Sequence, residues 1–401
     1  MPKPRAPTPL VGPRLVYVDR LRVFAVLAVF IIHVCEVFNP WDEWHITAPV
    51  RSRILGEIVV VLAPWIMPLF MLLAGVSAYY SLGRRKNGEY LRERARRLLV
   101  PLVLGVLTLV PPQVYLERRF RGQFSGSFIA FYPHFFDGIY PTGNFSWHHL
   151  WFLGHLAAYS VIALPLFRFW QHRRGEGMLQ SLARLYSSPH GLLWLALPLI
   201  IERTLLWGIL PERHMLESDW SNHALLLVAY VYGFVLAATP SLGKAIDAQW
   251  RWTFVVALLT SAVLVTGIWI GALPGRLPAS YSWEYAGFWA LYAIGAWAWV
   301  VTMLGVGRRW LHREGPELRY GREIGYEFYL FHQPVIVAAA YWVVAWRVGL
   351  LEQFISVLAI SACGTWISVK FFRSGNAAVR SLVHALRVAV RERRTLAARE
   401  R

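Results

Sequence analysis

Two ionisable side chains, Arg22 and His33, lie in an otherwise apolar segment with the sequence VYVDRLRVFAVLAVFIIHVCEVF. His33 follows Arg22 by eleven positions along the chain. In an α-helix this spacing brings two side chains to within roughly 20° of one another on the same face, about 16 Å apart along the axis. Because ionisable groups are costly to bury in lipid, they usually face a protein interior or a wet cavity and mark functional sites. The spacing therefore predicts a guanidinium and an imidazole that share one groove at two depths of a membrane.

Arg22 and His33 are the candidate catalytic pair, with His33 as the base. A neutral imidazole can accept a proton from a hydroxyl group. A histidine inside a membrane can also serve only as a hydrogen bond between helices, which is the structural alternative. Two carboxylates could orient the imidazole: Glu36, three residues further along, and Glu57, near the outer end of the next apolar segment. The sequence does not choose between them.

A cluster of arginines precedes the third apolar segment, in LRERARRLLVP, and comprises Arg92, Arg94, Arg96 and Arg97. Arg94 and Arg97 are three residues apart and would share a helix face, where they could clamp a phosphate group. Ordinary positive charge on the cytoplasmic side of a membrane protein is the alternative explanation. The cluster is expected at the same membrane face as Arg22, so we interpret the arginines as binding a negatively charged ligand from the cytoplasm.

Two further segments carry histidines beside aromatic residues or proline. In SWHHLWFLGHL, His149 is flanked by Trp147 and Trp151 at the expected outer interface. Trp147, His149 and Trp151 either anchor the protein in the interface or bind a sugar ring of the substrate, and both interpretations remain. In FYLFHQPVIV, His332 precedes Pro334, which favours a structural kink with a freed carbonyl group. No cysteine or carboxylate completes a metal-ligand pattern around these histidines, so no metal site is predicted.

The composition shows which elements must position these residues. Of 401 residues, 56% are hydrophobic, which is typical of a multi-pass membrane protein rather than a soluble one. Cys35 and Cys363 fall inside apolar segments, so no disulfide framework is predicted. We expect an all-α protein with about ten transmembrane helices. The apolar segments lie near 21–39, 55–82, 98–116, 149–170, 191–209, 222–240, 252–272, 285–306, 323–345 and 351–372.

Positive charge predicts the orientation of these helices. Lys and Arg gather near the N-terminus, at 83–97, at 307–322 and in the C-terminal tail, whereas the intervening loops hold few. Since short cytoplasmic loops carry such an excess, both termini are expected in the cytoplasm. The net charge of +18 follows from this orientation and from anionic membrane lipids, and we predict no nucleic-acid partner. The expected parts are a cytoplasmic arm (1–20), a membrane domain (21–372) and a basic cytoplasmic tail (373–401).

Five segments in this order resemble the acyltransferase family 3 of integral membrane proteins, in particular the branch of glucan biosynthesis protein C. They are DRLRVFAVLAVFIIH, PLFMLLAGVSAYYSL, the pair Arg94 and Arg97 in RARR before LLVP, HLWFL and FYLFHQP. The resemblance implies a multi-pass enzyme of the cell membrane, expected to be a bacterial plasma membrane. Such an enzyme moves an acyl group, for example acetyl or succinyl, from cytoplasmic acyl-CoA to a hydroxyl at the outer face. The acceptor is commonly a glycan or glycolipid.

The resemblance also assigns roles to residues of this chain. Arg22 and His33 match the essential pair of the family. Arg94 and Arg97 match its cytoplasmic arginine motif, which is expected to hold the coenzyme A phosphates. We expect Arg22 to guide the pantetheine arm so that the thioester arrives beside His33. His33 would then deprotonate the acceptor hydroxyl, and a covalent acyl-histidine is the competing mechanism.

Two features keep other interpretations open. Gln333 stands where many relatives have a second histidine before the proline, so His332 is only a candidate for substrate binding. A transporter or flippase could use a buried arginine and histidine as a substrate or proton pathway. A structural or signalling membrane protein could use the same residues only to hold helices together.

Overall fold

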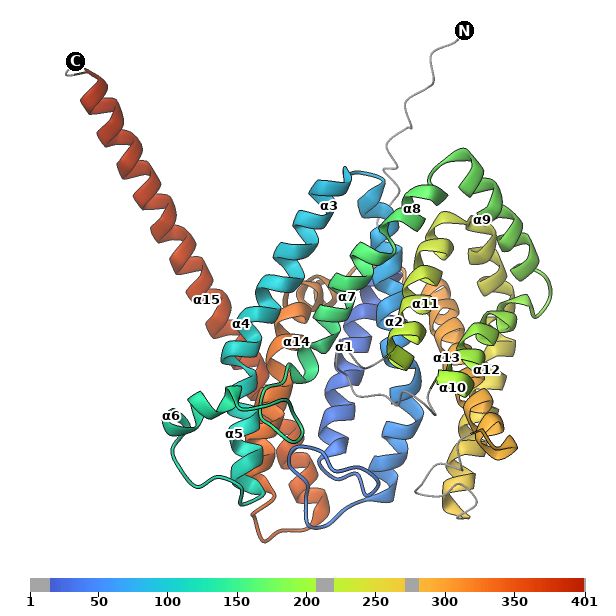
Figure 1. The fold of residues 1–401 in the computed structure, drawn as a ribbon, viewed down its shortest axis with the longest axis horizontal. Helices are drawn as coiled ribbons and strands as arrows, with labels where there is room; N and C mark the ends of the chain where they lie inside the picture. The colour runs from blue at the N-terminus through green and yellow to red at the C-terminus, as the bar shows by residue number, and fades with distance from the viewer. Residues whose placement is uncertain (1–14, 207–219, 271–280, 400–401) are drawn as a thin grey trace.

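The computed structural model describes residues 15–206, 220–270 and 281–399 (Figure 1). The protein is 82% helical, and the described ranges contain no β-strand, which confirms the all-α prediction for them. The first half contains α1 (Val16–Glu36), α2 (Arg53–Leu82), α3 (Asn87–Arg94), the π-helical turn η1 (Ala95–Leu99), α4 (Val100–Thr108), α5 (Val110–Phe120), α6 (Phe128–Phe131) and the 3-10 turn η2 (Tyr132–Phe136). The second half contains η3 (His148–Leu150), α7 (Trp151–Ile162), α8 (Leu164–Trp170), α9 (Arg173–Tyr186), η4 (Gly191–Ala196), α10 (Leu197–Leu206), α11 (Trp220–Ala238), α12 (Pro240–Trp269), α13 (Trp283–Trp310), α14 (Pro316–Val343) and α15 (Leu350–Arg399).

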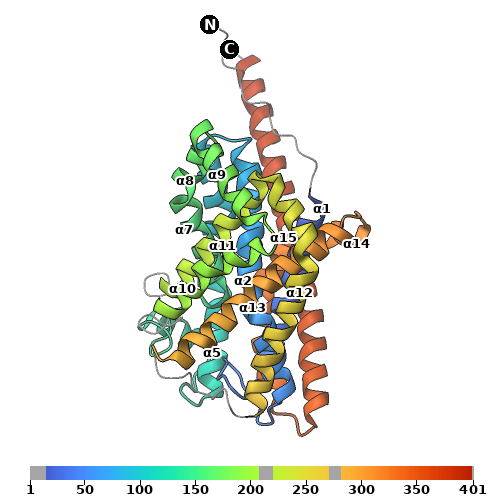
Figure 2. The same ribbon diagram turned by 90° about the vertical axis from the view of Figure 1, so that its right-hand side faces the viewer.

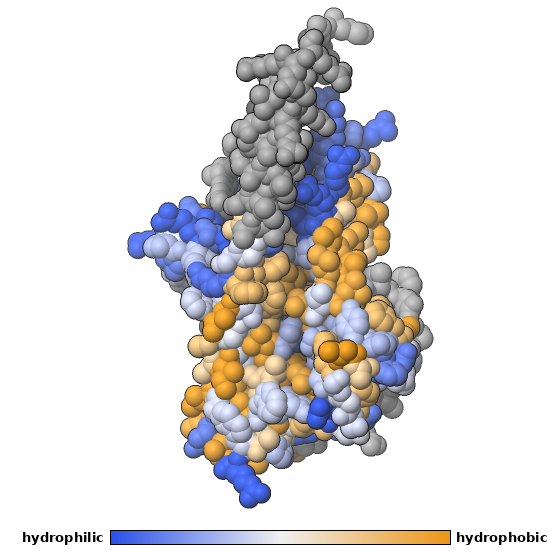
Figure 3. Space-filling model, turned by 90° about the vertical axis from the view of Figure 1, so that its left-hand side faces the viewer, coloured by the Kyte–Doolittle hydropathy of each residue, from blue (hydrophilic) through white to orange (hydrophobic). Residues whose placement is uncertain are grey.

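Six helices of the described ranges are long and apolar enough to cross a bilayer. They are Arg53–Leu82, Asn87–Phe120, Ser221–Ala238, Pro240–Trp269, Trp283–Trp310 and Leu350–Ala377. The segments His148–Ile162 and Leu164–Trp170 meet at a 49° bend and make a seventh span if they cross together. In Figure 3, hydrophobic side chains cover much of the middle of one face and hydrophilic ones gather toward its upper end. These features are those of an integral membrane protein, whereas ten spans and cytoplasmic termini stay predictions.

Helices α1 and α14 are less apolar than these six because polar residues interrupt them. Asp19, Arg20 and Arg22 lie near the start of α1, and His332 and Gln333 lie within α14. Both helices are packed inside the bundle: α1 contacts α2, α13 and α14, and α14 contacts α5 and α15 (Figures 1 and 2). Their polar side chains therefore have protein neighbours, as expected for ionisable groups within a membrane. Residues 1–14 of the predicted arm and the side chains of residues 378–401 lie outside the described part.

Helices α2 and α11 cross with their backbones almost in contact. A Cβ atom added at Gly75 would lie 1.9 Å from the carbonyl oxygen of Tyr230, and one at Gly233 would lie 1.8 Å from that of Leu72. Small residues allow such close approach between membrane helices. The crossing fixes the turn of α2 that belongs to PLFMLLAGVSAYYSL, and this turn holds Arg22, as described below.

Candidate functional site

The imidazole of His33 on α1 is hydrogen-bonded to the imidazole of His332 on α14. Nδ1 of His33 lies 2.9 Å from Nε2 of His332. Nδ1 of His332 lies 2.6 Å from the carbonyl oxygen of Tyr329, which can only accept, so this nitrogen carries a proton. In neutral His332 the other nitrogen, Nε2, is therefore the acceptor, and His33 donates to it from Nδ1. The basic lone pair of neutral His33 is then on Nε2.

This arrangement gives His33 the properties of an oriented general base. A proton taken up at Nε2 produces an imidazolium whose Nδ1–H still points at the lone pair of His332. The ring of Trp44, from the loop between α1 and α2, stacks on His33 with centroids 5.8 Å apart and planes at 21°. The His33 side chain is half-buried. The base is therefore held by rings from two segments and keeps partial exposure.

Pro334 explains how a third histidine reaches this pair. Proline has no backbone N–H, so the carbonyl group four residues earlier, that of Leu330, lacks its helical donor. Nε2 of His149 lies 3.0 Å from this oxygen and donates to it. The His149 ring then stands edge-on to that of His332, with centroids 5.2 Å apart. The proline of FYLFHQPVIV thus frees the carbonyl group that holds His149, which the sequence analysis placed among the substrate-binding residues.

Arg22 lies toward the other end of α1 and is held by α2. Its Nη2 donates to the carbonyl oxygen of Leu73 at 2.9 Å and to Oγ of Ser77. Its Nη1 lies 3.3 Å from the carboxylate of Asp19, which also pairs with Arg322 of α14 at 3.4 Å. The Arg22 side chain is 36% exposed. The guanidinium is thus fixed by protein groups, and the side chain as a whole keeps partial exposure.

The predicted arginine cluster occupies the end of α3 and the turn η1. Arg92 and Arg94 lie on α3, and Arg96 and Arg97 lie on η1. Arg94 lies over the ring of Tyr90 at 5.1 Å, whereas Arg97 pairs with Glu93 at 3.1 Å. The two residues of the predicted clamp therefore contact different neighbours. The hydroxyl of Tyr326 on α14 donates to the carbonyl oxygen of Arg97 at 2.8 Å, which joins the arginine segment to the helix that carries His332.

The two carboxylates that the sequence offered for orienting His33 have other surroundings. Glu36 accepts a hydrogen bond from Nδ2 of Asn39 at 2.8 Å. Glu57 lies on α2, and its Oε1 is buried with no hydrogen-bond partner among the described residues. Nδ1 of His33, the nitrogen that an orienting carboxylate would hold, is bonded to His332. The orienting group in the structure is thus His332, which is far from His33 in the sequence but bonded to it in space.

The tryptophans on either side of the adjacent histidines lie against a different ring. Trp147 and Trp151 both pack on His155, with ring centroids 5.8 and 4.9 Å from it. Trp147 also covers Gly154, where an added Cβ would lie 2.8 Å from its ring. The two tryptophan rings thus pack against His155 on α7, whereas the His149 ring packs against His332. Their predicted contact with a sugar stays a prediction.

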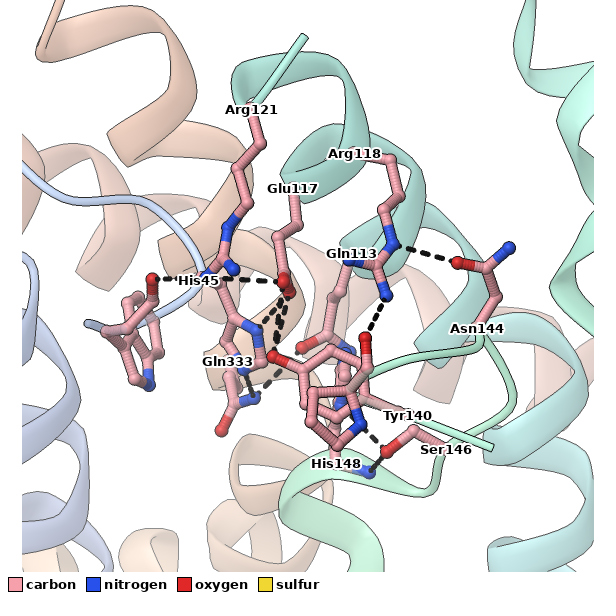
Figure 4. Close-up of polar contacts among 12 residues, drawn as sticks. His45, Gln113, Glu117, Arg118, Arg121, Tyr140, Asn144, Ser146, His148 and Gln333 are labelled. Atoms are coloured by element: carbon pink, nitrogen blue, oxygen red, sulfur yellow. Dashed lines mark hydrogen bonds and ion pairs between the residues drawn. The ribbon is translucent and has the colours of Figure 1, made fainter. Parts of the chain in front are cut away.

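A second group of polar residues, which we call the Glu117 cluster, includes Gln333, the residue that follows His332 on α14 (Figure 4). It consists of His45, Gln113, Glu117, Arg121, Tyr140, His148 and Gln333. Oε2 of the fully buried Glu117 lies 2.6 Å from Nδ1 of His45, and the Tyr140 hydroxyl donates to Oε1 at 3.1 Å. Arg121 lies 3.4 Å from Oε1. Burial, and next the Glu117 carboxylate, raise the pKa of Tyr140 above its ordinary value of 10.0, so the phenol keeps its proton for this bond.

The hydrogen bonds of two glutamines determine where the His45 proton lies. Gln113 donates from Nε2 to the carbonyl oxygen of Leu109 at 2.8 Å, so its Oε1 accepts from Nε2 of Gln333 at 3.1 Å. The same nitrogen of Gln333 donates to Nε2 of His45 at 3.2 Å. The proton of neutral His45 is therefore on Nδ1, facing Glu117. Because Gln333 follows His332 directly, the Glu117 cluster is anchored to the turn of α14 that carries His332.

Three residues of this cluster also have the chemistry of metal ligands. His45, Glu117 and His148 each offer one ligand atom, and these atoms lie within 4.8 Å of one another. Two imidazoles and a carboxylate suit zinc. A proton on Nδ1 of His45 and the guanidinium of Arg121 beside the carboxylate both oppose a divalent cation. The contacts therefore favour a hydrogen-bonded network in which protons, rather than a metal ion, join these groups.

An open hollow of about 460 Å³ lies next to this cluster, on α5 and the loops that follow it. Its wall includes Arg118, whose guanidinium donates to Oδ1 of Asn144 at 2.8 Å and to the carbonyl oxygen of Gly143 at 2.7 Å. The exposed side chains of His134 and Asp137 contribute to its lining. Glu117 and Arg118 are neighbours on α5, so the hollow and the Glu117 cluster share one helix.

Comparison with known proteins identifies relatives of the whole helical part. A family model described as "Acyltransferase domain" matches residues 15–370. Proteins named "Glucans biosynthesis protein C" from Salmonella paratyphi A and Salmonella agona are 21% identical to the chain over 334 residues. The alignment covers 81% of this chain and 83% of each relative. No solved structure matches the chain. The range matched by the family model includes Arg22, His33, His332 and the entire Glu117 cluster.

Proposed function

Because the chain belongs to this acyltransferase family, we propose that it transfers an acyl group from cytoplasmic acyl-CoA to a hydroxyl of an extracytoplasmic glycan or glycolipid. The observation that carries the proposal is the hydrogen bond from Nδ1 of His33 to Nε2 of His332, which puts the basic lone pair on Nε2 of His33. The similarity to proteins named for glucan biosynthesis supports a glycan as the acceptor class. The setting is the bacterial plasma membrane, with both termini in the cytoplasm and about ten spans.

The donor enters from the inner face. Arg22, together with the exposed arginines of α3 and η1, binds the phosphates of coenzyme A by charge-assisted hydrogen bonds. The pantetheine arm then follows α1, which rises about 16 Å between Arg22 and His33. The thioester carbonyl comes to rest beside the imidazole of His33.

The acceptor enters from the outer face, past the hollow on the loops after α5. Nε2 of His33 takes the proton of the acceptor hydroxyl while its oxygen attacks the thioester carbonyl. The tetrahedral intermediate collapses, the C–S bond breaks, and the proton passes from His33 to the sulfur. The products are an ester and coenzyme A thiol. In the competing sequence Nε2 of His33 attacks the carbonyl carbon and the C–S bond breaks, which gives an acyl-histidine and coenzyme A thiolate. The acceptor oxygen then attacks the acyl carbon, the bond to Nε2 breaks, and the proton of the acceptor hydroxyl passes to the thiolate.

The test uses the purified full-length protein in detergent or lipid discs with radiolabelled acetyl-CoA and succinyl-CoA and a panel of oligosaccharides and glycolipids. We expect label to become covalently bound to an acceptor, and His33→Ala to abolish this label. His312→Ala, at an exposed position away from these clusters, is the matched control. Label that crosses the membrane of proteoliposomes without becoming bound to an acceptor would instead establish a transporter. Full turnover by His33→Ala would contradict the assigned base.

A further inference from the structure

His148 is held in a backbone conformation that histidine rarely adopts. Its φ angle is 42°, in the left-handed region that non-glycine residues seldom occupy. Its side chain is only 8% exposed. Such conformations cost folding free energy and persist where surrounding contacts hold the residue, often at functional sites. The turn η3 therefore holds the His148 ring inside the protein despite this cost.

One nitrogen of this ring is buried without a partner. Nδ1 of His148 lies 3.0 Å from Oγ of Ser146. Nε2 is buried and has no hydrogen-bond partner among the described residues. A buried polar atom left unsatisfied is costly and rare, and it indicates that a ligand or an ordered water completes the site.

The ring of His148 has polar neighbours and adjoins the proposed reaction centre. The ring of His148 lies 4.3 Å from that of His45, and one of its nitrogens lies within 4.8 Å of a Glu117 oxygen (Figure 4). The next residue, His149, lies against His332, the partner of His33. Two consecutive residues of η3 therefore place one ring, that of His148, in the Glu117 cluster and the next, that of His149, against the pair of His33 and His332. A molecule bound at His148 would lie beside the His33 centre.

We propose that Nε2 of His148 binds a second hydroxyl of the sugar ring whose neighbouring hydroxyl receives the acyl group. This proposal rests on the proposed function. A hydroxyl both donates and accepts, so it pairs with Nε2 whichever ring nitrogen carries the proton. It is also neutral, so it adds no charge beside the Glu117 carboxylate and Arg121. A sugar carries adjacent hydroxyls, so one can be held by His148 while another faces His33. His148 is thus a positioning residue for the acceptor.

The test compares His148→Asn with wild type in steady-state assays of the full-length protein. Asparagine tolerates a left-handed backbone, so this variant should fold at least as well as wild type. We expect the KM for the acceptor to rise about tenfold, as for one lost hydrogen bond in a buried site. The KM for acyl-CoA should stay unchanged. The thermal midpoint should not fall. His190→Asn is the matched control, because His190 also has a positive φ angle, 64°, and its ring packs against Trp252 instead.

Deoxy-sugars identify the hydroxyl. In the wild type, the acceptor that lacks the bound hydroxyl should lose about tenfold in kcat/KM, and His148→Asn should show no further loss with it, because the two changes remove one interaction. Additive losses, or an unchanged acceptor KM, would leave only an ordered water at Nε2 and overturn the proposal. One zinc ion per chain that is lost in His148→Asn would also overturn it. If wild-type protein transfers no acyl group from any acyl-CoA, the proposed function itself fails.

Discussion

In the proposed orientation, the polar residues at the inner end of the helix bundle, near Arg22, and those at the outer end, near His33, are held in opposite ways. At the inner end the Arg97 side chain is 75% exposed, and it pairs with a carboxylate one turn away. At the outer end His149 and His332 are buried; both ring nitrogens of His332 and Nε2 of His149 bond to carbonyl oxygens or to another ring. Exposed, flexible cations can bind a mobile anion, whereas proton transfer requires a nitrogen at a fixed position. Under the proposed function, this contrast predicts that the inner end governs affinity for the donor and that the outer end governs the rate of transfer.

Removal of the proposed base gives the largest effect that this contrast predicts. His33→Ala should lower kcat for acyl transfer by about 100-fold or more, because a positioned general base contributes at least this much. The KM for acyl-CoA should stay within about twofold, since the arginines at the inner end are untouched. Steady-state kinetics with labelled acyl-CoA measure both values, and a raised donor KM with an unchanged kcat would reverse the assignment.

Loss of the orienting ring tests whether His33 needs a fixed tautomer. His332→Ala should lower kcat by about 10- to 100-fold, since nothing then accepts the proton on Nδ1 of His33. His332→Gln, whose amide oxygen can accept this proton, should recover part of the rate. Equal rates for the alanine and glutamine variants would mean that His332 only fills space.

Arg22 should affect the donor more than the rate. In Arg22→Lys the fork of guanidinium donors is lost, so the bonds to Leu73 and Ser77 cannot form together with a bond to phosphate. We expect the KM for acyl-CoA to rise about tenfold, as for one charge-assisted hydrogen bond. Titration with acyl-CoA at saturating acceptor measures this. A lower kcat with an unchanged KM would place Arg22 in the chemical step instead.

The two arginines of the predicted clamp should give the smallest effect and the strongest dependence on salt. The double variant Arg94→Gln with Arg97→Gln should raise the donor KM about two- to fivefold at low salt, and less at 0.5 M NaCl, because salt screens the charges of the exposed Arg97 and the half-buried Arg94. The matched control changes Arg92 and Arg96 to glutamine. A similar loss in both double variants would indicate general positive charge rather than a specific clamp.

The helices could be predicted from the sequence because runs of hydrophobic residues and positively charged loops are local sequence patterns. Each of the ten predicted apolar segments overlaps helices of the described ranges, although α12 begins 12 residues before the segment 252–272 and α15 extends 27 residues beyond the segment 351–372. The placement of Arg22 and His33 on one helix, α1, also follows from spacing alone. The partner of His33 did not follow, because His332 is 299 residues away and reaches it only through the packing of α14 on α1. Local reasoning offered Glu36 and Glu57, which are closer along the chain.

The Glu117 cluster was beyond local reasoning for a related reason. His45 lies in WDEWH and Glu117 in YLERR, and both segments are typical of polar ends of membrane helices. Their meeting depends on how the outer loops fold back over α5 and α14. The tautomer of His45 depends further on the amide orientation of Gln333, which is set by Gln113. Such a network follows from three-dimensional packing alone.

Pro334 has a consequence for how this chain can vary. The seat of His149 exists because one backbone hydrogen atom is missing from α14, at the position that would otherwise bond the Leu330 carbonyl. Any other amino acid at residue 334 would return that hydrogen and compete with the imidazole for the same oxygen. A substitution of Pro334 that restores the helical hydrogen bond would therefore detach the His149 ring from His332. Selection at this position would act on the absence of a backbone N–H group.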